Sequence, residues 1–222
     1  QLHHADPLSA MRHSLRLDTL VRLRWLAIIG QTAAVLVVLA GFGMALPLLP
    51  CLAVIALSLG LNIALRLAFP VTERLDYGRA AMLLGFDILQ LAALLAMTGG
   101  LANPFALLFL APVLISATSL PPAQTTGLGL LAFAATSLLA WFHMPLPWPD
   151  GAFELPRLYV TGVWIAITLA LVFISTYAWR VAEEGRQLSQ ALAATELVLA
   201  REQHVSALDG LAAAAAHELG TP

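Results

Sequence analysis

The stretch that decides the fold covers residues 88–149 and reads ILQLAALLAMTGGLANPFALLFLAPVLISATSLPPAQTTGLGLLAFAATSLLAWFHMPLPWP. It contains no Asp, Glu, Lys or Arg, and neither does a second apolar run over residues 25–65. One helical crossing of a bilayer needs about 20 predominantly apolar residues. Each run is therefore long enough for at least two spans, and we expect an integral membrane protein.

The composition of the whole chain excludes a soluble domain. Hydrophobic residues make up 60% of the chain and charged residues 11%, whereas about a quarter of the residues in soluble domains are charged. Cys51 is the single cysteine, so no disulfide can form within the chain. The first apolar run is longer than a signal-peptide core and lacks a convincing cleavage site, so we expect it to be a retained span.

Six helices are predicted, because backbone groups in lipid must find their hydrogen bonds within the helix. Pro, Gly and charged residues delimit them as residues 25–46, 48–69, 80–98, 104–119, 123–143 and 158–179. The expected fold class is an all-α membrane protein with six transmembrane helices followed by a cytoplasmic coiled-coil and dimerisation helix. Residues 25–179 would form the transmembrane sensor domain, and residues 1–24 a cytoplasmic N-terminal segment.

The arginines predict the orientation. With six spans and both chain ends on one side, only Arg157 falls on the opposite side. The same-side arginines are Arg12, Arg16, Arg22, Arg24, Arg66, Arg74, Arg79, Arg180, Arg186 and Arg201. The positive-inside rule assigns that side to the cytoplasm. We therefore expect a multi-pass protein with both termini cytoplasmic.

The composition changes after Trp179, where charged residues alternate with regularly spaced apolar ones. One apolar seam consists of Leu188, Leu192, Thr195 and Leu199, and a second of Val205, Leu208, Ala212, Ala215 and Leu219. Such spacing is typical of coiled coils, and the two seams are out of phase near Glu202, as a stammer would make them. We predict a dimeric coiled-coil linker over residues 180–210.

Residues 211–222 are expected to begin a dimerisation and histidine-phosphotransfer domain. Their last part, His-Glu-Leu-Gly-Thr-Pro, provides a histidine with an acidic neighbour. His217 is the candidate phosphoacceptor, Glu218 its acid/base partner, and Thr221, on the same helical face, a candidate for phosphatase chemistry. Gly220 and Pro222 would soften the helix around the reactive residue. The alternative is an ordinary surface histidine on an alanine-rich helix.

A second motif, Gly-Gly-Leu-Ala-Asn-Pro-Phe, occupies residues 99–105. In a structural interpretation, Gly99 or Gly100 ends the third helix in a left-handed conformation, Asn103 caps the fourth, and Pro104 takes its first position. In a functional interpretation, the same capped helix start offers N–H groups to a quinone carbonyl. Phe105 would then stack on the head group and the Asn103 amide would bond a carbonyl.

Polar residues within the spans are also candidates for function. Asp87 is the only carboxylate well inside a predicted span, and Gln90, Asn62 and Arg66 are expected at a similar depth. A structural polar cluster is the plainer interpretation, and a proton path is the sharper alternative. His143 is either an interfacial histidine or a contributor to head-group binding.

The two motifs together resemble the RegB/PrrB family of redox-sensing histidine kinases, and the resemblance covers the amino-terminal half of that family. It rests on Ala-Ala-Ala-His-Glu-Leu-Gly-Thr-Pro at residues 214–222 and on the family's Gly-Gly-x-x-Asn-Pro-Phe segment. It implies a homodimer in the bacterial inner membrane that senses the ubiquinone pool. His217 would be autophosphorylated and would pass its phosphoryl group to a response regulator.

The resemblance also sets expectations for ligands. The quinone-binding residues that the resemblance implies are Gly99, Gly100, Asn103, Pro104 and Phe105. ATP with Mg²⁺ would bind the full-length protein but not this segment, which lacks the ATP-binding boxes and should not phosphorylate itself. Membrane lipid and quinone are expected partners; no direct nucleic-acid partner and no metal site are expected, and Cys51 does not match the family's regulatory cysteine.

Two alternatives remain open. One is a histidine kinase that senses a different membrane signal. The other is a six-helix transporter or scaffold with a dimerising tail, against which the sequence shows no inverted repeat and no pair of broken helices in corresponding halves.

Overall fold

The computed structural model describes residues 17–41, 46–70, 75–148, 151–153 and 155–219. Side chains are described within these ranges except for residues 146–153 and 205–219. The chain divides into two units, Gln1–Trp179 and Arg180–Pro222. Each unit is treated by itself below.

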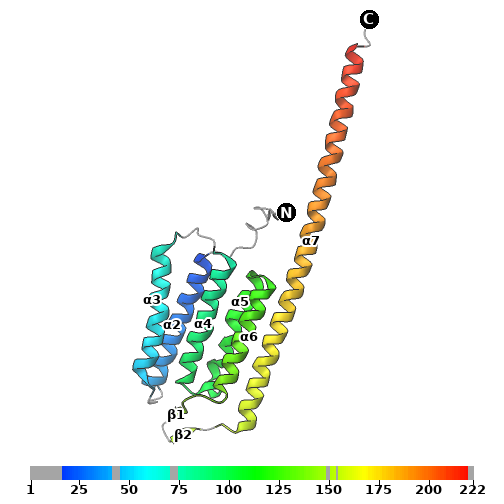
Figure 1. Ribbon diagram of the computed structural model, residues 1–222. Helices are drawn as coiled ribbons and strands as arrows, with labels where there is room; N and C mark the ends of the chain where they lie inside the picture. Colours follow the sequence, from blue (N-terminus) through cyan, green and yellow to red (C-terminus); the bar gives the residue numbers. More distant parts are fainter. Residues whose placement is uncertain (1–16, 42–45, 71–74, 149–150, 154, 220–222) are drawn as a thin grey trace, which may run out of the picture. The chain divides into compact units, whose positions relative to one another are not determined.

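The first unit is a bundle of antiparallel helices (Figure 1). Its long helices are α2 (Leu17–Gly41), α3 (Leu48–Ala68), α4 (Tyr77–Ala96), α5 (Leu110–Ser119) and α6 (Pro122–Leu139). Two 3-10 helices, η1 (Gly100–Ala102) and η2 (Pro104–Phe109), lie between α4 and α5. The helix α7 (Arg157–Leu219) contributes its first part to this unit.

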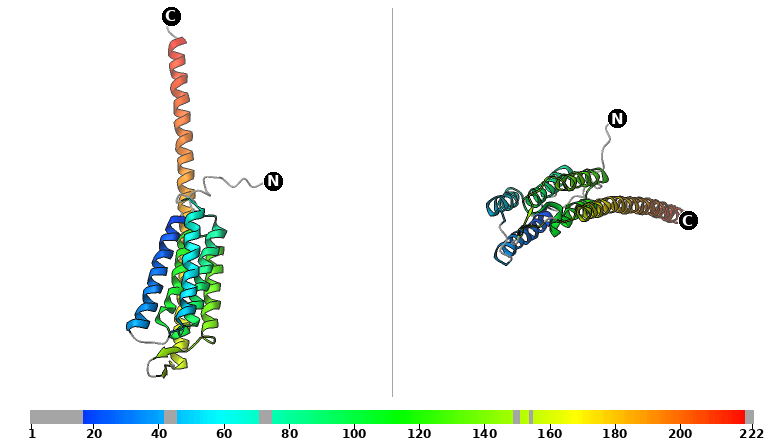
Figure 2. Two further views of the ribbon diagram at one scale, coloured as in Figure 1. Left: turned by 90° about the vertical axis from the view of Figure 1, so that its left-hand side faces the viewer. Right: turned by 90° about the horizontal axis from the view of Figure 1, so that it is seen from below.

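Consecutive helices of this unit alternate in direction and lie side by side in every view (Figures 1 and 2). Among the described residues, four helices are long and apolar enough to cross a membrane, namely α2, α3, α4 and α7. Residues Pro104–Ser119 form a shorter apolar helix, and α6 is 18 residues long. The predicted helical fold, with helices long and apolar enough to cross a membrane, is confirmed, whereas the six crossings stay a prediction.

A short hairpin was not expected from the sequence. Strand β1 (Leu146–Trp148) pairs antiparallel with β2 (Gly151–Phe153), with Leu146 opposite Phe153. It joins α6 to α7 at the end of the bundle where η1 also lies (Figure 1). An isolated two-stranded pair is marginal by itself, so this hairpin depends on the helices beside it.

Several predicted helix boundaries were wrong. The first helix begins at Leu17 and not at residue 25, because Asp18 and the arginines after it find partners within the bundle. The third helix begins at Tyr77, where the side chain of Asp76 accepts a hydrogen bond from the Gly78 N–H at 3.1 Å and caps it. The fifth predicted helix, residues 123–143, corresponds to α6, which ends at Leu139, four residues before His143.

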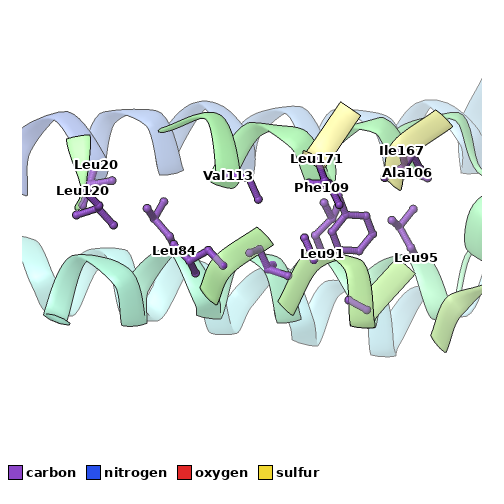
Figure 3. Close-up of a cluster of buried hydrophobic side chains, with 14 of the residues drawn as sticks. Leu20, Leu84, Leu91, Leu95, Ala106, Phe109, Val113, Leu120, Ile167 and Leu171 are labelled. Atoms are coloured by element: carbon purple, nitrogen blue, oxygen red, sulfur yellow. The ribbon is translucent and has the colours of Figure 1, made fainter. Parts of the chain in front are cut away.

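The core of the first unit lies around α4, which contacts α3, α5, α6 and both 3-10 helices. Phe109, Leu84, Leu95 and Val113 are almost completely buried there (Figure 3), and so is Ile88. Ile167 and Leu171 bring α7 into the same cluster. Because α4 ends directly before the Gly-Gly motif, its packing determines where that motif begins.

Cys51 lies in a second, smaller cluster of buried residues. It is fully buried, and its neighbours there are Ile28, Val35, Ile55 and Leu94. The thiol is free, and the residue serves as a small apolar group packed between helices.

The second unit consists of the remainder of α7. The helix continues without a break from Arg157 through Glu202 to Leu219, so the phase change between the two apolar seams is not accompanied by a helix end. Leu188, Leu192 and Leu199 are exposed in this single chain. The predicted coiled coil therefore has an uncovered apolar seam, and the dimer stays a prediction.

Candidate functional site

The Gly-Gly motif forms a tight left-handed turn at the end of α4. Gly99 has φ 102° and Gly100 has φ 57°, and these are the positive-φ glycines among the described residues. Only glycine adopts this region without strain. The predicted left-handed glycine conformation is confirmed at Gly99, but α4 itself ends earlier, at Ala96, with Met97 as its C-cap in the right-handed helical region.

Asn103 closes the turn with both ends of its side chain. Its Nδ2 donates to the Thr98 carbonyl oxygen at 2.9 Å and is 3.0 Å from the Thr98 Oγ1. Its Oδ1 accepts the Phe105 N–H at 2.9 Å, which caps η2. Pro104 occupies the first helical position, where its missing N–H costs nothing. The structural interpretation of the motif is therefore confirmed.

The outer surface of the turn is aromatic and apolar. Phe105 is 46% exposed and Pro104 is also exposed, whereas the next turn is anchored by the buried Ala106 and Phe109. Phe105 is therefore free to contact a lipid-soluble ring. The Asn103 amide already uses both its donor and its acceptor inside the turn, so it would have to give up these bonds to meet a ligand.

His143 lies directly against Gly100. A Cβ added to Gly100 would lie 2.6 Å from the Cγ and Cδ2 atoms of His143. The segment is held in place by the Met144 N–H, which donates to the Ala96 carbonyl oxygen at 2.7 Å. The imidazole is exposed, with its Nδ1 3.1 Å from the Met144 carbonyl oxygen. His143, which was predicted to be either an interfacial histidine or a contributor to head-group binding, thus lies against the Gly-Gly turn.

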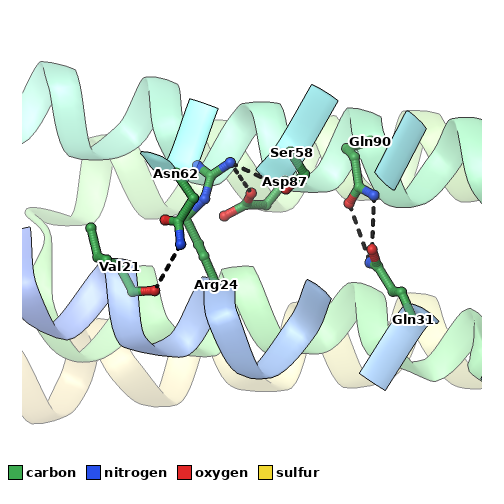
Figure 4. Close-up of polar contacts among 7 residues, drawn as sticks. All are labelled: Val21, Arg24, Gln31, Ser58, Asn62, Asp87 and Gln90. Atoms are coloured by element: carbon green, nitrogen blue, oxygen red, sulfur yellow. Dashed lines mark hydrogen bonds and ion pairs between the residues drawn. The ribbon is translucent and has the colours of Figure 1, made fainter. Parts of the chain in front are cut away.

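A second group of polar residues joins α2, α3 and α4 (Figure 4). Arg24 on α2 forms an ion pair with Asp87 on α4, with Nη2 3.3 Å from Oδ1. The same Nη2 donates to the Ser58 Oγ of α3 at 3.4 Å, and the guanidinium carbon lies 5.2 Å from the centre of the Phe86 ring. Buried charge in a membrane helix is expected only with such partners.

The predicted cluster of Asp87, Gln90, Asn62 and Arg66 was wrong in its partners. Arg66 pairs with Asp18 at 3.1 Å, and Gln90 exchanges two hydrogen bonds with Gln31 at 2.9 and 3.2 Å. Asn62 donates to the Val21 carbonyl oxygen at 3.3 Å. Every one of these partners lies on α2. The predicted first helix began at residue 25 and therefore left Arg24 out, whereas α2 begins at Leu17.

The histidine box lies at the end of the second unit. His217 and Glu218 fall within α7, which extends to Leu219, and their side chains are not among those described. Thr221, with Gly220 and Pro222, lies outside the described residues. The predicted roles of these residues stay predictions.

The fold and the two motifs define a helical membrane protein whose last helix leads into a histidine box. The chain is 45% identical over 208 residues to sensor histidine kinase RegB of Cereibacter sphaeroides, which covers 93% of this chain and 45% of that protein. A protein of the same name from a strain of that species is 46% identical over 209 residues, or 94% of this chain and 45% of that relative. The predicted resemblance to the RegB/PrrB family is confirmed.

The chain spans about 45% of the length of these curated relatives. No family model matches the chain. No solved structure matches it either.

Proposed function

We propose that this chain is the sensor half of a membrane histidine kinase in a two-component system. The observation that carries this proposal is the identity of 45–46% to RegB proteins over 93–94% of the chain. It is supported by the His-Glu-Leu-Gly-Thr-Pro box, which stands at the end of a continuous helix that begins in the apolar bundle.

The proposed location is the inner membrane of a bacterium, with six crossings and both ends in the cytoplasm. The crossings would be α2, α3, α4, the pair η2 and α5, α6, and α7 as far as Trp179. Arginine distribution supports this. Arg22 lies near the start of α2, Arg66 in the last turn of α3 and Arg79 near the start of α4, and these three helix ends lie together at one end of the bundle (Figure 1). Arg157 begins α7, whose first residues lie at the other end. Positive residues are retained on the cytoplasmic side.

The proposed reaction is phosphoryl transfer. A ring nitrogen of His217 attacks the γ-phosphorus of ATP, the bond to the ADP oxygen breaks, and ADP leaves. Glu218 would hold the other ring proton and raise the nucleophilicity of the imidazole. The phosphoryl group then passes to an aspartate of a response regulator. In a separate phosphatase reaction, Thr221 would orient a water that attacks the aspartyl phosphate and releases inorganic phosphate and the free carboxylate. ATP and Mg²⁺ would bind the part of the full-length protein outside this chain.

The proposed signal is the redox state of ubiquinone at the Gly-Gly turn. Phe105 and Pro104 present an exposed surface on which a quinone ring can stack, and His143 stands beside Gly100 at the same turn. Gly99, Gly100 and Asn103 would act by shaping the turn, because the Asn103 amide is engaged with Thr98 and Phe105. The two redox forms must differ in affinity for two conformations if they regulate.

Radiolabelled ATP tests the kinase proposal on the full-length protein in liposomes. Acid-labile, base-stable phosphate should appear on the wild type, be absent from His217→Gln, and move to the cognate regulator on mixing. A transporter or scaffold would show no such phosphate. Quinone-free lipids separate the redox proposal from a kinase for another membrane signal, which would phosphorylate His217 equally with and without added quinone.

A further inference from the structure

Asp18 holds two arginines at one end of the bundle. Its Oδ2 lies 2.8 Å from Nε of Arg22 on the same helix, α2. Its Oδ1 accepts a hydrogen bond from Nη1 of Arg66 on α3 at 3.1 Å. Because both contacts are made to one carboxylate, the two guanidinium groups lie beside each other where the start of α2 meets the end of α3 (Figure 1).

These three side chains, the Asp18 trio, carry more positive than negative charge. Two arginines stand against one aspartate, so the trio has one net positive charge. The side chains of Arg22 and Arg66 are 78% and 48% exposed, whereas the Asp18 side chain is 18% exposed. The carboxylate is thus the inner member of the trio, and an anion that approaches from outside meets the guanidinium groups.

The contacts with Asp18 leave N–H groups of both arginines for other partners. They use Nε of Arg22 and Nη1 of Arg66, and a guanidinium has five N–H donors in a planar fork. The non-bridging oxygens of a phosphodiester match this fork, and arginine is well suited to such recognition. A phosphodiester carries one negative charge, which would balance the trio.

The surface beside the arginines is apolar. Leu26 and Ile29 lie one and two turns after Arg22, on the same face of α2, and they are 70% and 60% exposed. On α3, Ile63 lies one turn before Arg66 and is 42% exposed. Both helices are long and apolar enough to cross a membrane. An acyl chain would therefore lie along this surface while its head group stays at the arginines.

This surface favours a phospholipid over a soluble anion. Free phosphate would use only the arginines, whereas a phospholipid uses the arginines with its phosphate and the apolar surface with its acyl chains. Basic residues at the end of a membrane helix attract anionic lipids. A zwitterionic phospholipid brings its own cation, which the net positive charge of the trio disfavours.

We propose that Arg22 and Arg66, held together by Asp18, form a binding site for the phosphodiester of an anionic phospholipid. The bound lipid joins α2 to α3 on the outside of the bundle. The site is separate from the Gly-Gly turn, which lies at the opposite end of the bundle (Figure 1). It rests on the proposed membrane location and not on the proposed kinase reaction.

Equilibrium binding of radiolabelled phosphatidylglycerol to the immobilised full-length protein in detergent micelles tests the proposal. The wild type should bind this lipid more tightly than phosphatidylcholine with the same acyl chains. Arg22→Gln and Arg66→Gln should each weaken the binding about tenfold, because each removes a charge-assisted contact with the phosphate.

Arg79→Gln is the matched control. It removes one exposed positive charge near the start of α4, at the same end of the bundle, and it leaves the Asp18 trio intact. Binding of phosphatidylglycerol to this variant should be nearly unchanged. Equal losses in all three variants would overturn the proposal, because binding would then follow the total charge of that end.

Two further results decide the source of the phosphate without any variant. Equal binding of the two lipids by the wild type would overturn the proposal. Inorganic phosphate, compared with chloride at the same ionic strength, should not displace phosphatidylglycerol, and displacement would show a site for free phosphate in place of a lipid. Phosphorylation of His217 is measured separately, so a failure of the lipid site and a failure of the kinase proposal are distinguishable.

Discussion

Arg24 and Asp87 form an ion pair that connects α2 to α4, with Nη2 3.3 Å from Oδ1. Arg24 is 4% exposed, and Ser58 of α3 accepts from the same nitrogen. The guanidinium of Arg24 on α2 therefore contacts side chains of both α3 and α4. An arginine that stands directly before a long apolar run belongs to the packed interior and does not simply flank the membrane.

The first prediction is that Arg24 and Asp87 are energetically coupled. Arg24→Gln leaves the partly buried carboxylate of Asp87, which is 22% exposed, without its partner, and should lower the free energy of unfolding by about 2 kcal/mol, less than the loss expected for a fully buried pair. The double variant Arg24→Gln/Asp87→Asn should cost clearly less than the sum of the two single variants. Thermal unfolding in detergent measures this.

Arg22→Gln is the control for that cycle. The Arg22 side chain is 78% exposed and pairs with Asp18 at 2.8 Å, and exposed pairs contribute about 0–1 kcal/mol. Additive losses for Arg24 and Asp87 would contradict the coupling.

The second prediction concerns Gly100 and His143. Gly100→Ala should cost about 2 kcal/mol, because its φ of 57° strains any other residue and the new Cβ would collide with the imidazole. His143→Ala should recover part of this cost, since the Cγ and Cδ2 contacts disappear while the Cβ contact at 2.8 Å remains. Equal costs of Gly100→Ala in the two backgrounds would show that the histidine does not rest on the glycine.

The third prediction separates the two roles of Asn103. Asn103→Ala removes the cap on Phe105 and the bonds to Thr98, and should cost more than the roughly 1 kcal/mol of a lost cap. Asn103→Ser keeps a neutral oxygen that can accept the Phe105 N–H, as serine commonly does at an N-cap, and loses the donor to Thr98 without placing a charge against its carbonyl oxygen, so it should cost less. Unfolding in detergent ranks the two variants, and the opposite order would refute the cap.

The fourth prediction concerns pH and the linker helix. Hydrogen bonds from Arg186 and Gln187 hold the pKa of the Glu183 carboxyl below its ordinary value of 4.5. Because the pKa is depressed in the folded helix, this contribution is fully present above that value and is lost as the pH falls through the lowered pKa.

Hydrogen exchange at residues 185–187, corrected for the intrinsic rate, should therefore show a small loss of protection in acid. Glu183→Gln should remove that dependence, and Glu196→Gln serves as the comparison variant. Identical acid profiles of Glu183→Gln and the wild type would contradict the prediction.

The fold was predictable from the sequence where hydropathy alone decides it. The absence of charge over residues 88–149 predicted the helices between α4 and α7. The residue types at Gly99, Asn103 and Pro104 predicted a left-handed glycine, an N-cap and a first helical position. Both signals are local, so they can be read without knowing which segments meet.

The partners of polar residues were not predictable in this way. Asp87 was predicted to lie well inside a span, but its partner Arg24 lies on α2 and was placed outside the first predicted span. The contact between Gly100 and His143 joins segments separated by the whole of α5 and α6. Arg24 could have been found by extending the apolar pattern of α2 backwards, since Leu17, Leu20, Val21, Arg24 and Ile28 form one buried face.

The most direct measurement of the central claim is the initial rate of His217 phosphorylation in quinone-free liposomes supplied with ubiquinone or with ubiquinol. The wild-type rates should differ severalfold between the two redox forms. Phe105→Leu, which removes the exposed ring at the Gly-Gly turn, should still be phosphorylated while its two rates converge. Equal wild-type rates with ubiquinone, with ubiquinol and without quinone would contradict the claim that this membrane bundle senses quinone redox state.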